Sequence, residues 1–345
     1  MCAMIHHRIS PYGRVLRPGV FGLLLVFLAG CAGGASLAPS TEADGSAPAD
    51  SSMDSSAPDT VTPPGDSNTL VPNNVAGGIA PGIVFASFDL PNTLLSTVHT
   101  GAMRTPDQNT LLSNLATARA KGARFVLKLA GGGDGWVKNA DGTFNFEKWK
   151  SMVNRYKNLD FRSYVADGTV LGHYLLDEPN LASRWGGKVI PQATVEAMAK
   201  YSKQLWPNML TFIRVVPSWL AAAPVPYTYL DAGWAQYAAY KGDPTKWLAG
   251  EVAIAKTKGL GLLVSLNILN GGNGSSGIRG PASGKYSMSA TELRTYGTAL
   301  LNQAYSCGFL MWMYNATYFG RTDIQAAMAD LSAKARSHVK TSCQQ

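Results

Sequence analysis

The sequence of 345 residues predicts a single (β/α)8 barrel of the TIM type, and three observations lead to this fold class. Short apolar runs alternate with longer helical patterns, as in the βαβ units that build a parallel sheet. No glycine-rich phosphate loop follows the first apolar run, which disfavours a nucleotide-binding, doubly wound sheet. Polar residues gather near the C-terminal ends of several predicted strands, where barrel enzymes carry their sites.

The elements follow from these patterns in chain order. The predicted strands cover residues 83–89, 124–129, 168–176, 210–216, a short segment near Tyr227, 260–267 and 309–314. The predicted helices cover residues 106–121, 146–158, 191–205, 245–258, 289–304 and 323–337. A closed barrel of this type has eight strands. Either the irregular stretch 219–240 contains the eighth strand, or the barrel is distorted or seven-stranded.

Residues 1–30 are interpreted as a lipoprotein signal peptide. Three arginines precede an apolar stretch, residues 20–30, that is too short to span a bilayer. The four residues that end at Cys31, LAGC, resemble the lipobox of bacterial lipoproteins, in which this Cys is lipidated. An ordinary signal peptide with a chance Cys is the alternative. Ala32 after the Cys implies, by the usual sorting rule, the outer membrane if the host is Gram-negative.

Residues 31–75 are predicted to form a disordered tether, and residues 76–345 a single barrel domain. The tether is rich in Ser, Pro, Ala and Asp and buries too little apolar surface to offset its ordering entropy. Removing the leader's three arginines and the tether's six acids from totals of 30 basic and 22 acidic residues leaves the domain at about +11.

The positive charge of the domain fits an acidic polysaccharide, a phosphate-rich surface or nucleic acid. No block of Lys and Arg interleaved with aromatic residues is present, and an exported, tethered protein seldom meets nucleic acid. A solvated basic surface explains the charge equally well. We therefore expect a monomer, with a membrane contact through the lipid and no nucleic-acid partner.

Two of the four cysteines remain for the domain after Cys2 leaves with the leader and Cys31 is lipidated. These two, Cys307 and Cys343, are expected to pair in an oxidising compartment. The bond would tie the C-terminal tail to the segment that enters the last strand. Two free buried thiols are the alternative.

Side-chain alternation places the polar residues of several strands on one face. The opposite, apolar faces are expected to pack on the helices, so the polar set would point into the barrel. This inward set is Ser87, Asp89, Lys128, Arg214, Ser265 and Asn267. Lys128, Arg214 and Asn267 are candidates for substrate binding.

Residues 171–179, LGHYLLDEP, end a predicted strand in two carboxylates and a proline. Alternation puts Glu178 in the pocket and points Asp177 the other way, as a structural residue. The motif resembles that of the (β/α)8 glycoside hydrolases, the clan with cellulases and β-galactosidases, in which Asn-Glu-Pro or Asp-Glu-Pro at a strand end supplies the general acid/base. The resemblance implies that Glu178 protonates the leaving oxygen. It also implies that Trp312, late in the last strand beside Tyr314, is a sugar platform.

A departure from this family concerns the second carboxylate. Retaining members need a Glu near the end of a later strand, but that strand ends in Asn267. The partner of Glu178 would then be Asp89 or Asp231, in an inverting reaction with a water between the acids. Asp231 lies close to Trp234, a candidate for sugar stacking. The alternative role of Asp231 is the N-cap of a helix over residues 232–240.

The expected function is therefore a glycoside hydrolase that needs no metal or organic cofactor. Burial is expected to hold Glu178 protonated near neutral pH. Two alternatives stay open. One is a non-catalytic carbohydrate-binding or envelope scaffold protein, because Asn267 replaces the nucleophile. The other is a polysaccharide lyase in which Lys128 or Arg214 neutralises a uronate.

Overall fold

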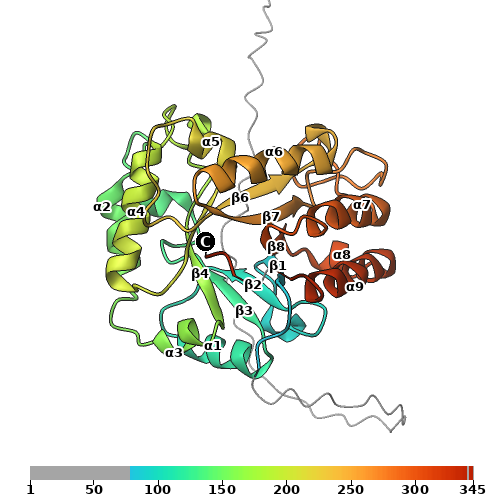
Figure 1. Ribbon diagram of the computed structural model, residues 1–345, viewed down its shortest axis with the longest axis horizontal. Coiled ribbons are helices and arrows are strands. Elements are labelled where there is room, and N and C mark those ends of the chain that lie inside the picture. Colours follow the sequence, from blue (N-terminus) through green and yellow to red (C-terminus); the bar gives the residue numbers. More distant parts are fainter. Residues whose placement is uncertain (1–77, 340–341, 345) are drawn as a thin grey trace, which may run out of the picture. The chain divides into compact units, whose positions relative to one another are not determined.

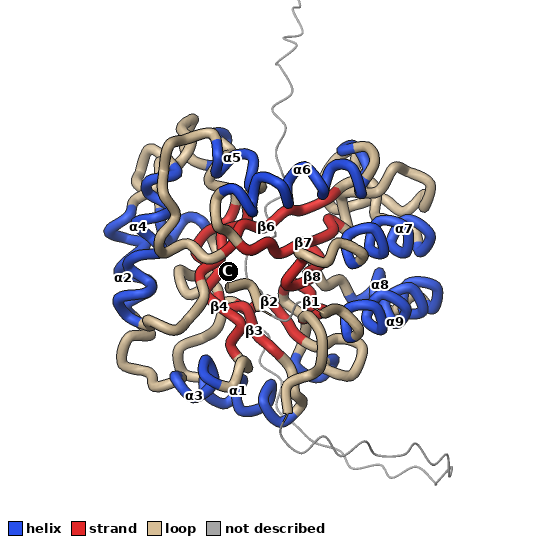
Figure 2. The backbone as a smooth tube through the Cα atoms, in the orientation of Figure 1, coloured by secondary structure: helices blue, strands red, loops and turns tan. Residues whose placement is uncertain are grey.

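The computed structural model describes residues 78–339 and 342–344, and these form a closed barrel of eight parallel strands in chain order (Figures 1 and 2). The strands are β1 (Val84–Phe88), β2 (Gly101–Arg104), β3 (Arg124–Leu127), β4 (Val170–Asp177), β5 (Thr211–Arg214), β6 (Ala232–Tyr237), β7 (Gly261–Asn267) and β8 (Ser306–Trp312). Parallel pairing of β1 with both β2 and β8 closes the cylinder. The predicted (β/α)8 fold class is confirmed, with eight strands.

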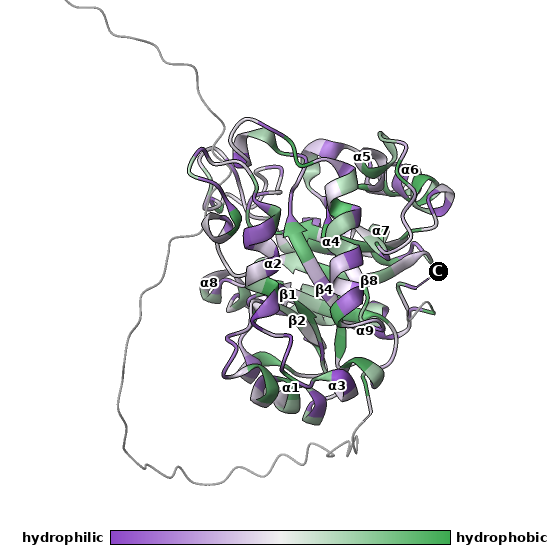
Figure 3. Cartoon of the chain, turned by 90° about the vertical axis from the view of Figure 1, so that its left-hand side faces the viewer, coloured by the Kyte–Doolittle hydropathy of each residue, from purple (hydrophilic) through white to green (hydrophobic). Residues whose placement is uncertain are grey.

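Helices surround the barrel on its outside (Figure 2). They are α1 (Leu111–Ala120), α2 (Phe146–Asn154), α3 (Arg162–Ala166), α4 (Gln192–Leu205), α5 (Pro217–Ala221), α6 (Pro244–Thr257), α7 (Ala290–Leu301), α8 (Ala316–Phe319) and α9 (Thr322–Arg336). Figure 3 shows mostly hydrophobic strands inside helices of mixed hydropathy, as expected for a buried parallel sheet. No helix in the described part of the chain is long and apolar enough to cross a bilayer.

The predicted signal peptide, the lipidated Cys31 and the tether up to residue 75 lie outside the described residues. They stay predictions.

Two strands differ from the sequence prediction. β2 was not expected at all, because it is only four residues long and begins at Gly101. A Cβ at this glycine would lie 2.3 Å from the carbonyl oxygen of Arg124, so the close approach of β3 requires glycine here. β6 covers Ala232–Tyr237, where a helix was the alternative, and no strand forms near Tyr227. The stretch 219–240 therefore contains one strand, β6, in place of the one predicted near Tyr227, and the eighth strand is β2.

The barrel has an inner apolar core as well as an outer one between the strands and the helices. The inner cluster consists of Val84, Ala86, Phe88, Met103, Val126, Leu171, Tyr174, Phe212, Ala232, Trp234, Leu263, Cys307, Leu310 and Cys343. Ser87, predicted to point inward, lies on the outer face of β1, where its hydroxyl donates to the carbonyl of Met311 over 3.0 Å. The prediction was wrong because a packed barrel interior is as apolar as the layer under the helices.

A disulfide joins Cys307 and Cys343, as predicted. Cys307 is the second residue of β8, and both cysteines are fully buried in the inner cluster. The tail also crosses the start of β7, since a Cβ at Gly261 would lie 2.2 Å from the carbonyl oxygen of Cys343. The bond thus fastens the C-terminal tail across the amino-terminal end of the barrel.

We predict that Cys343→Ala lowers the free energy of unfolding by about 3–4 kcal/mol, because the bond closes a loop between residues 36 positions apart. Urea denaturation with and without a reductant measures this difference. Reductant should weaken the wild type to about the level of the variant and leave the variant unchanged. An unchanged wild type under full reduction would contradict the assignment.

Candidate active site

The two acids of the LLDEP motif lie together at the carboxyl end of β4. Asp177 is the last residue of the strand, and Glu178 follows with a positive φ of 44°. The register of β4 against β5 shifts between Tyr174 and Asp177, and Asp177 then pairs with Arg214. This irregularity breaks the strict alternation on which the sequence prediction relied. Asp177 therefore does not point away from the site but faces the same cations as Glu178.

Two guanidinium groups hold this acid pair. Arg214, the last residue of β5, contacts Asp177 through Nε and places Nη2 3.1 Å from Oε1 of Glu178. Arg184 comes from a short helix, η3 (Ala182–Arg184), in the loop after β4. Its Nη1 lies 2.8 Å from Oδ2 of Asp177 and 2.9 Å from Oε2 of Glu178. Its Nε contacts Asp134 in the loop after β3. One arginine thus bridges carboxylates from two loops.

The charges around Asp177 outweigh its burial. Burial alone would raise the pKa of this carboxyl, but Arg214, Arg184 and Lys128 together hold the pKa well below its usual value. Burial would likewise lower the pKa of Arg214, and Asp177 and Glu178 raise it well above its usual value. Both guanidinium groups also contact Glu178. The protonated state expected for this acid stays a prediction.

Two lysines flank the acid pair. Lys128, just beyond β3, is 7% exposed, and its ammonium donates to the carbonyl of Gly132 over 3.1 Å. Lys241 belongs to η4 (Ala239–Lys241), in the loop after β6, and its ammonium lies 4.6 Å from the centre of the Trp247 ring. Burial lowers the pKa of both lysines. Lys128 is influenced by the charge of Asp177, and Lys241 by those of Glu251 and Glu178.

The structure removes Asp231 and Trp234 from the candidate site. Asp231 precedes β6 and accepts hydrogen bonds from the amide and hydroxyl of Thr211, the first residue of β5. It also pairs with Lys203 over 2.8 Å. Since β6 rises about 3.3 Å per residue, this carboxylate lies roughly 16 Å along the strand from Gln236, at the amino-terminal end. It caps no helix there.

Trp234 is 1% exposed and belongs to the inner cluster. Its ring centre lies 5.2 Å from those of Phe88 and Tyr174, so it packs the barrel interior and is not available to stack on a sugar. The prediction made it a candidate for sugar stacking beside Asp231. As part of β6 it instead points toward the barrel axis below Gln236.

Other predicted residues do lie at the carboxyl end. Asn267 ends β7 and pairs in register with Trp312, which ends β8. The side-chain oxygen of Asn267 accepts from the amide of Asn270 over 3.0 Å. Tyr314 follows β8, and its amide donates to the carbonyl of Phe88. Asp89 follows β1 and is exposed, at the same end as Glu178. Their roles in binding or catalysis stay predictions.

Sequence reasoning missed several residues that the loops and β6 bring to this end. Gln236 accepts from Nη1 of Arg214 over 2.9 Å, and Trp136 is 62% exposed in η2 (Asp134–Val137). Asp134, Arg184 and Lys241 stand in loops with no periodic pattern. Gln236 alone had a usable signal in the sequence, because it alternates with Trp234 along β6, a segment for which the sequence analysis left a helix as an alternative.

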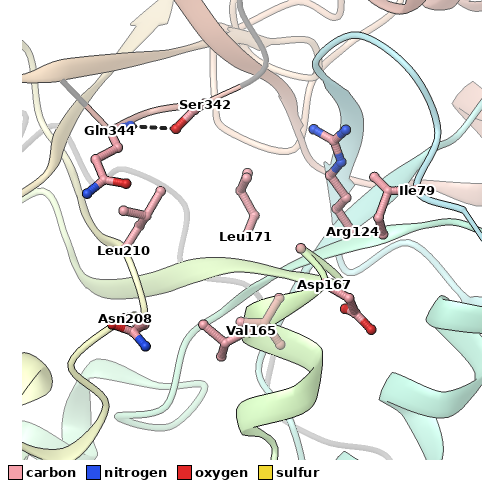
Figure 4. A pocket seen from close by; sticks show the side chains of 11 residues that line it. Ile79, Arg124, Val165, Asp167, Leu171, Asn208, Leu210, Ser342 and Gln344 are labelled. Carbon is pink, nitrogen blue, oxygen red and sulfur yellow. Dashed lines mark hydrogen bonds between the residues drawn. The ribbon is translucent and has the colours of Figure 1, made fainter.

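A cavity of about 360 Å³ lies elsewhere, at the amino-terminal end of the barrel (Figure 4). Its lining includes Arg124 and Leu171 near the starts of β3 and β4, and Ser342 and Gln344 from the C-terminal tail. Barrel enzymes carry their sites at the opposite end. We therefore place the candidate site on the charged residues at the carboxyl end. Within residues 78–339 and 342–344, no group of His, Cys, Asp or Glu is arranged to hold a metal ion.

We predict that Asp177→Asn destabilises the protein by about 3 kcal/mol at neutral pH, because it removes one partner of a buried ion pair. The pKa of Asp177 in the fold lies below the value of about 4 of an unfolded Asp. The contribution of the Asp177 carboxylate to stability is therefore fully present above about pH 4 and falls as the pH drops below that value. The difference between wild type and variant should shrink below about pH 4.

Urea denaturation at several pH values measures this difference. Asp330→Asn is the matched control, since Asp330 pairs with Arg294 on the surface with a side chain that is 59% exposed. It should cost at most about 1 kcal/mol. Equal losses in the two variants would contradict the buried ion pair.

Comparison with known proteins shows the fold. No family model matches the sequence, and no curated protein matches it. A GH2 β-galacturonidase from Eisenbergiella tayi is similar in structure, with a TM-score of 0.50, 10% identity and coverage of 76% of this chain and 52% of that one. This chain thus spans about half the length of that enzyme.

Two further structures are similar at lower TM-scores. A GH113 β-1,4-mannanase gives 0.48 at 12% identity, covering 74% of this chain and 99% of that chain. The catalytic domain of an endoglucanase from Xanthomonas campestris gives 0.46 at 13% identity, covering 75% and 94%. At 10% identity, the likeness to the β-galacturonidase is one of fold alone, and it agrees with the closed (β/α)8 barrel.

Proposed function

We propose that this barrel is a glycoside hydrolase and that Glu178 is its catalytic carboxylate. The observation that carries the proposal is the position of Glu178, immediately after β4 at the carboxyl end, inside a cluster of partly buried charges. Its side chain is 19% exposed, so it remains open to a substrate. Carboxylates in this position suit cleavage of a glycosidic bond by acid/base catalysis.

The ion pairs define how Glu178 would work as an acid. Arg214 is buried and fixed by Asp177 and Gln236, whereas the side chain of Arg184 is 26% exposed and comes from a loop. A substrate that draws Arg184 away removes one positive charge from Glu178 and favours uptake of a proton. Asp89 is the remaining candidate for the partner carboxylate, because it lies at the same end and Asp231 does not.

A non-catalytic glycan-binding protein is the second candidate. Asn267 ends β7, where retaining enzymes of this fold carry a nucleophile, and both acids of β4 are engaged by arginines. Such a protein would bind a glycan without turnover. A hydrolase would release reducing ends from a glycan, and a binding protein would not.

We predict that Glu178→Gln lowers turnover by roughly 100-fold or more, because the amide cannot transfer a proton. A panel of plant, algal and bacterial glycans, assayed for reducing ends, identifies a substrate and measures the loss. Glu147→Gln is the control, since the side chain of Glu147 is 78% exposed in α2. Near-normal turnover by Glu178→Gln would contradict the assignment, and binding of glycans by the wild type without any cleavage would favour the second candidate.

We also propose that the protein is exported and held on the cell envelope by a lipid on Cys31. The support is the lipobox-like LAGC, followed by a stretch rich in Ser and Pro. Cys31→Ala should move the protein from the membrane fraction to the soluble one. An unchanged membrane fraction would contradict the anchor.

A further inference from the structure

Lys128 and Lys241 are cations without a carboxylate partner. In the described part of the chain, the ion pairs within 4.0 Å include neither lysine. Lys128 uses one of its three donors, on the carbonyl of Gly132. Lys241 lies over the ring of Trp247. Both ammonium groups therefore keep donors for a further acceptor.

The burial of Lys128 makes the lack of an ion-pair partner energetically unfavourable. An ammonium group that leaves water without a counter-charge loses much of its solvation, and lysines are almost never fully buried unless paired. Lys128 is nevertheless only 7% exposed. The nearby carboxylate of Asp177 does not form an ion pair with Lys128, because it is already paired with Arg214 and Arg184. Such a residue in a charged site is a candidate for binding a ligand.

The two lysines flank the acid pair on both sides. Lys128 follows β3 and Lys241 follows β6, and the barrel order places β4 and β5 between them. Asp177 and Glu178 stand at the end of β4. An extended ligand across this end of the barrel would meet an ammonium group on either side of the acids.

The two lysines carry charge that no ion pair uses. Arg184 and Arg214 pair with Asp134, Asp177 and Glu178, whereas Asp89 and Glu251 act on Lys128 and Lys241 without forming an ion pair with them. Each ammonium group therefore keeps its charge available to an anionic ligand. Positive charge at a partly desolvated site raises the local concentration of anionic ligands.

An exposed aromatic residue in the same loop suits a sugar. Trp136 follows Asp134 by two residues, and Asp134 is tied to Arg184. One side of its indole is backed by glycines, since a Cβ at Gly131 or Gly133 would lie 3.6 Å from the ring. The side chain stays 62% exposed, which leaves an amphipathic surface for stacking.

We propose that the substrate is an anionic glycan whose carboxylate or sulfate groups bind Lys128 and Lys241 on either side of Glu178. The proposal rests on the glycan-directed function given above, and it names the class of glycan. The two lysines act by binding, so their effect is measurable without turnover.

The test measures binding of oligogalacturonate and of its methyl ester to the full-length protein by calorimetry. The two probes share one sugar backbone and differ in charge. The free acid should bind at least about tenfold more tightly than the ester, and added salt should reduce only the binding of the acid. A sulfated galactan oligosaccharide and a neutral manno-oligosaccharide complete the panel. Preference for either anionic probe supports the proposal and assigns the carboxylate or the sulfate.

The variants assign this preference to the lysines. Lys241→Met should weaken binding of the preferred anionic probe by about tenfold and leave the methyl ester unchanged. Lys128→Met should act in the same direction, and Lys241→Met keeps the test valid if the buried substitution unfolds the protein. Lys246→Met, at an exposed position in the first turn of α6, is the control and should change neither probe.

Failure of this inference is distinct from failure of the proposed function. Equal binding of acid and ester, or equal weakening of both by Lys241→Met, would overturn the anionic class even if neutral glycans are cleaved. Charge-dependent binding without cleavage would support the anionic class and overturn the hydrolase. An unsaturated product that absorbs in the ultraviolet would also support the anionic class, but by elimination of a uronate instead of hydrolysis.

Discussion

The arrangement at the carboxyl end of the barrel depends on the buried guanidinium of Arg214. This side chain contacts Asp177, Glu178 and Gln236, and so joins the ends of β4, β5 and β6. Two adjacent carboxylates repel each other and lose solvation when buried, so a cation in contact with both stabilises the end of β4. Arg184 adds the loops after β3 and β4 to the same network. One buried charge therefore fixes the position of the candidate catalytic acid.

The sequence predicted the fold better than it predicted which side chains of each strand point into the barrel. Lys128, Arg214 and the Asp177-Glu178 pair were found because charges in apolar strands are conspicuous. Ser87 was misplaced because both faces of a barrel strand are apolar, and alternation does not tell which face is inside. Trp234 was misplaced because β6, the strand that contains it, was not predicted. The register shift after Tyr174 turned Asp177 toward the site, and no sequence pattern marks such a shift. Arg184 and Lys241 were not predicted, because they lie in loops, where no periodic pattern indicates that a side chain reaches the site.

The two ends of the barrel differ in how completely their charged groups are paired. At the amino-terminal end, Asp231 accepts a hydrogen bond from Thr211 and pairs with Lys203, and the Cys307–Cys343 bond fastens the tail. Buried or partly buried polar groups with such partners are typical of structural contacts. At the carboxyl end, Lys128 and Lys241 keep unused donors beside an acid pair that is still partly exposed. Incomplete pairing of this kind costs stability, and binding of a ligand offsets that cost.

An anionic substrate would also change the acid itself. Two guanidinium groups contact Glu178, and cations beside a carboxylate oppose the uptake of a proton. A negative group bound between Lys128 and Lys241 competes for Arg184, the more exposed of the two arginines, and places a like charge near Glu178. Both effects favour uptake of a proton by this carboxylate. Binding of an anionic substrate would thus help Glu178 to act as the general acid proposed above, and a neutral glycan would not supply this effect.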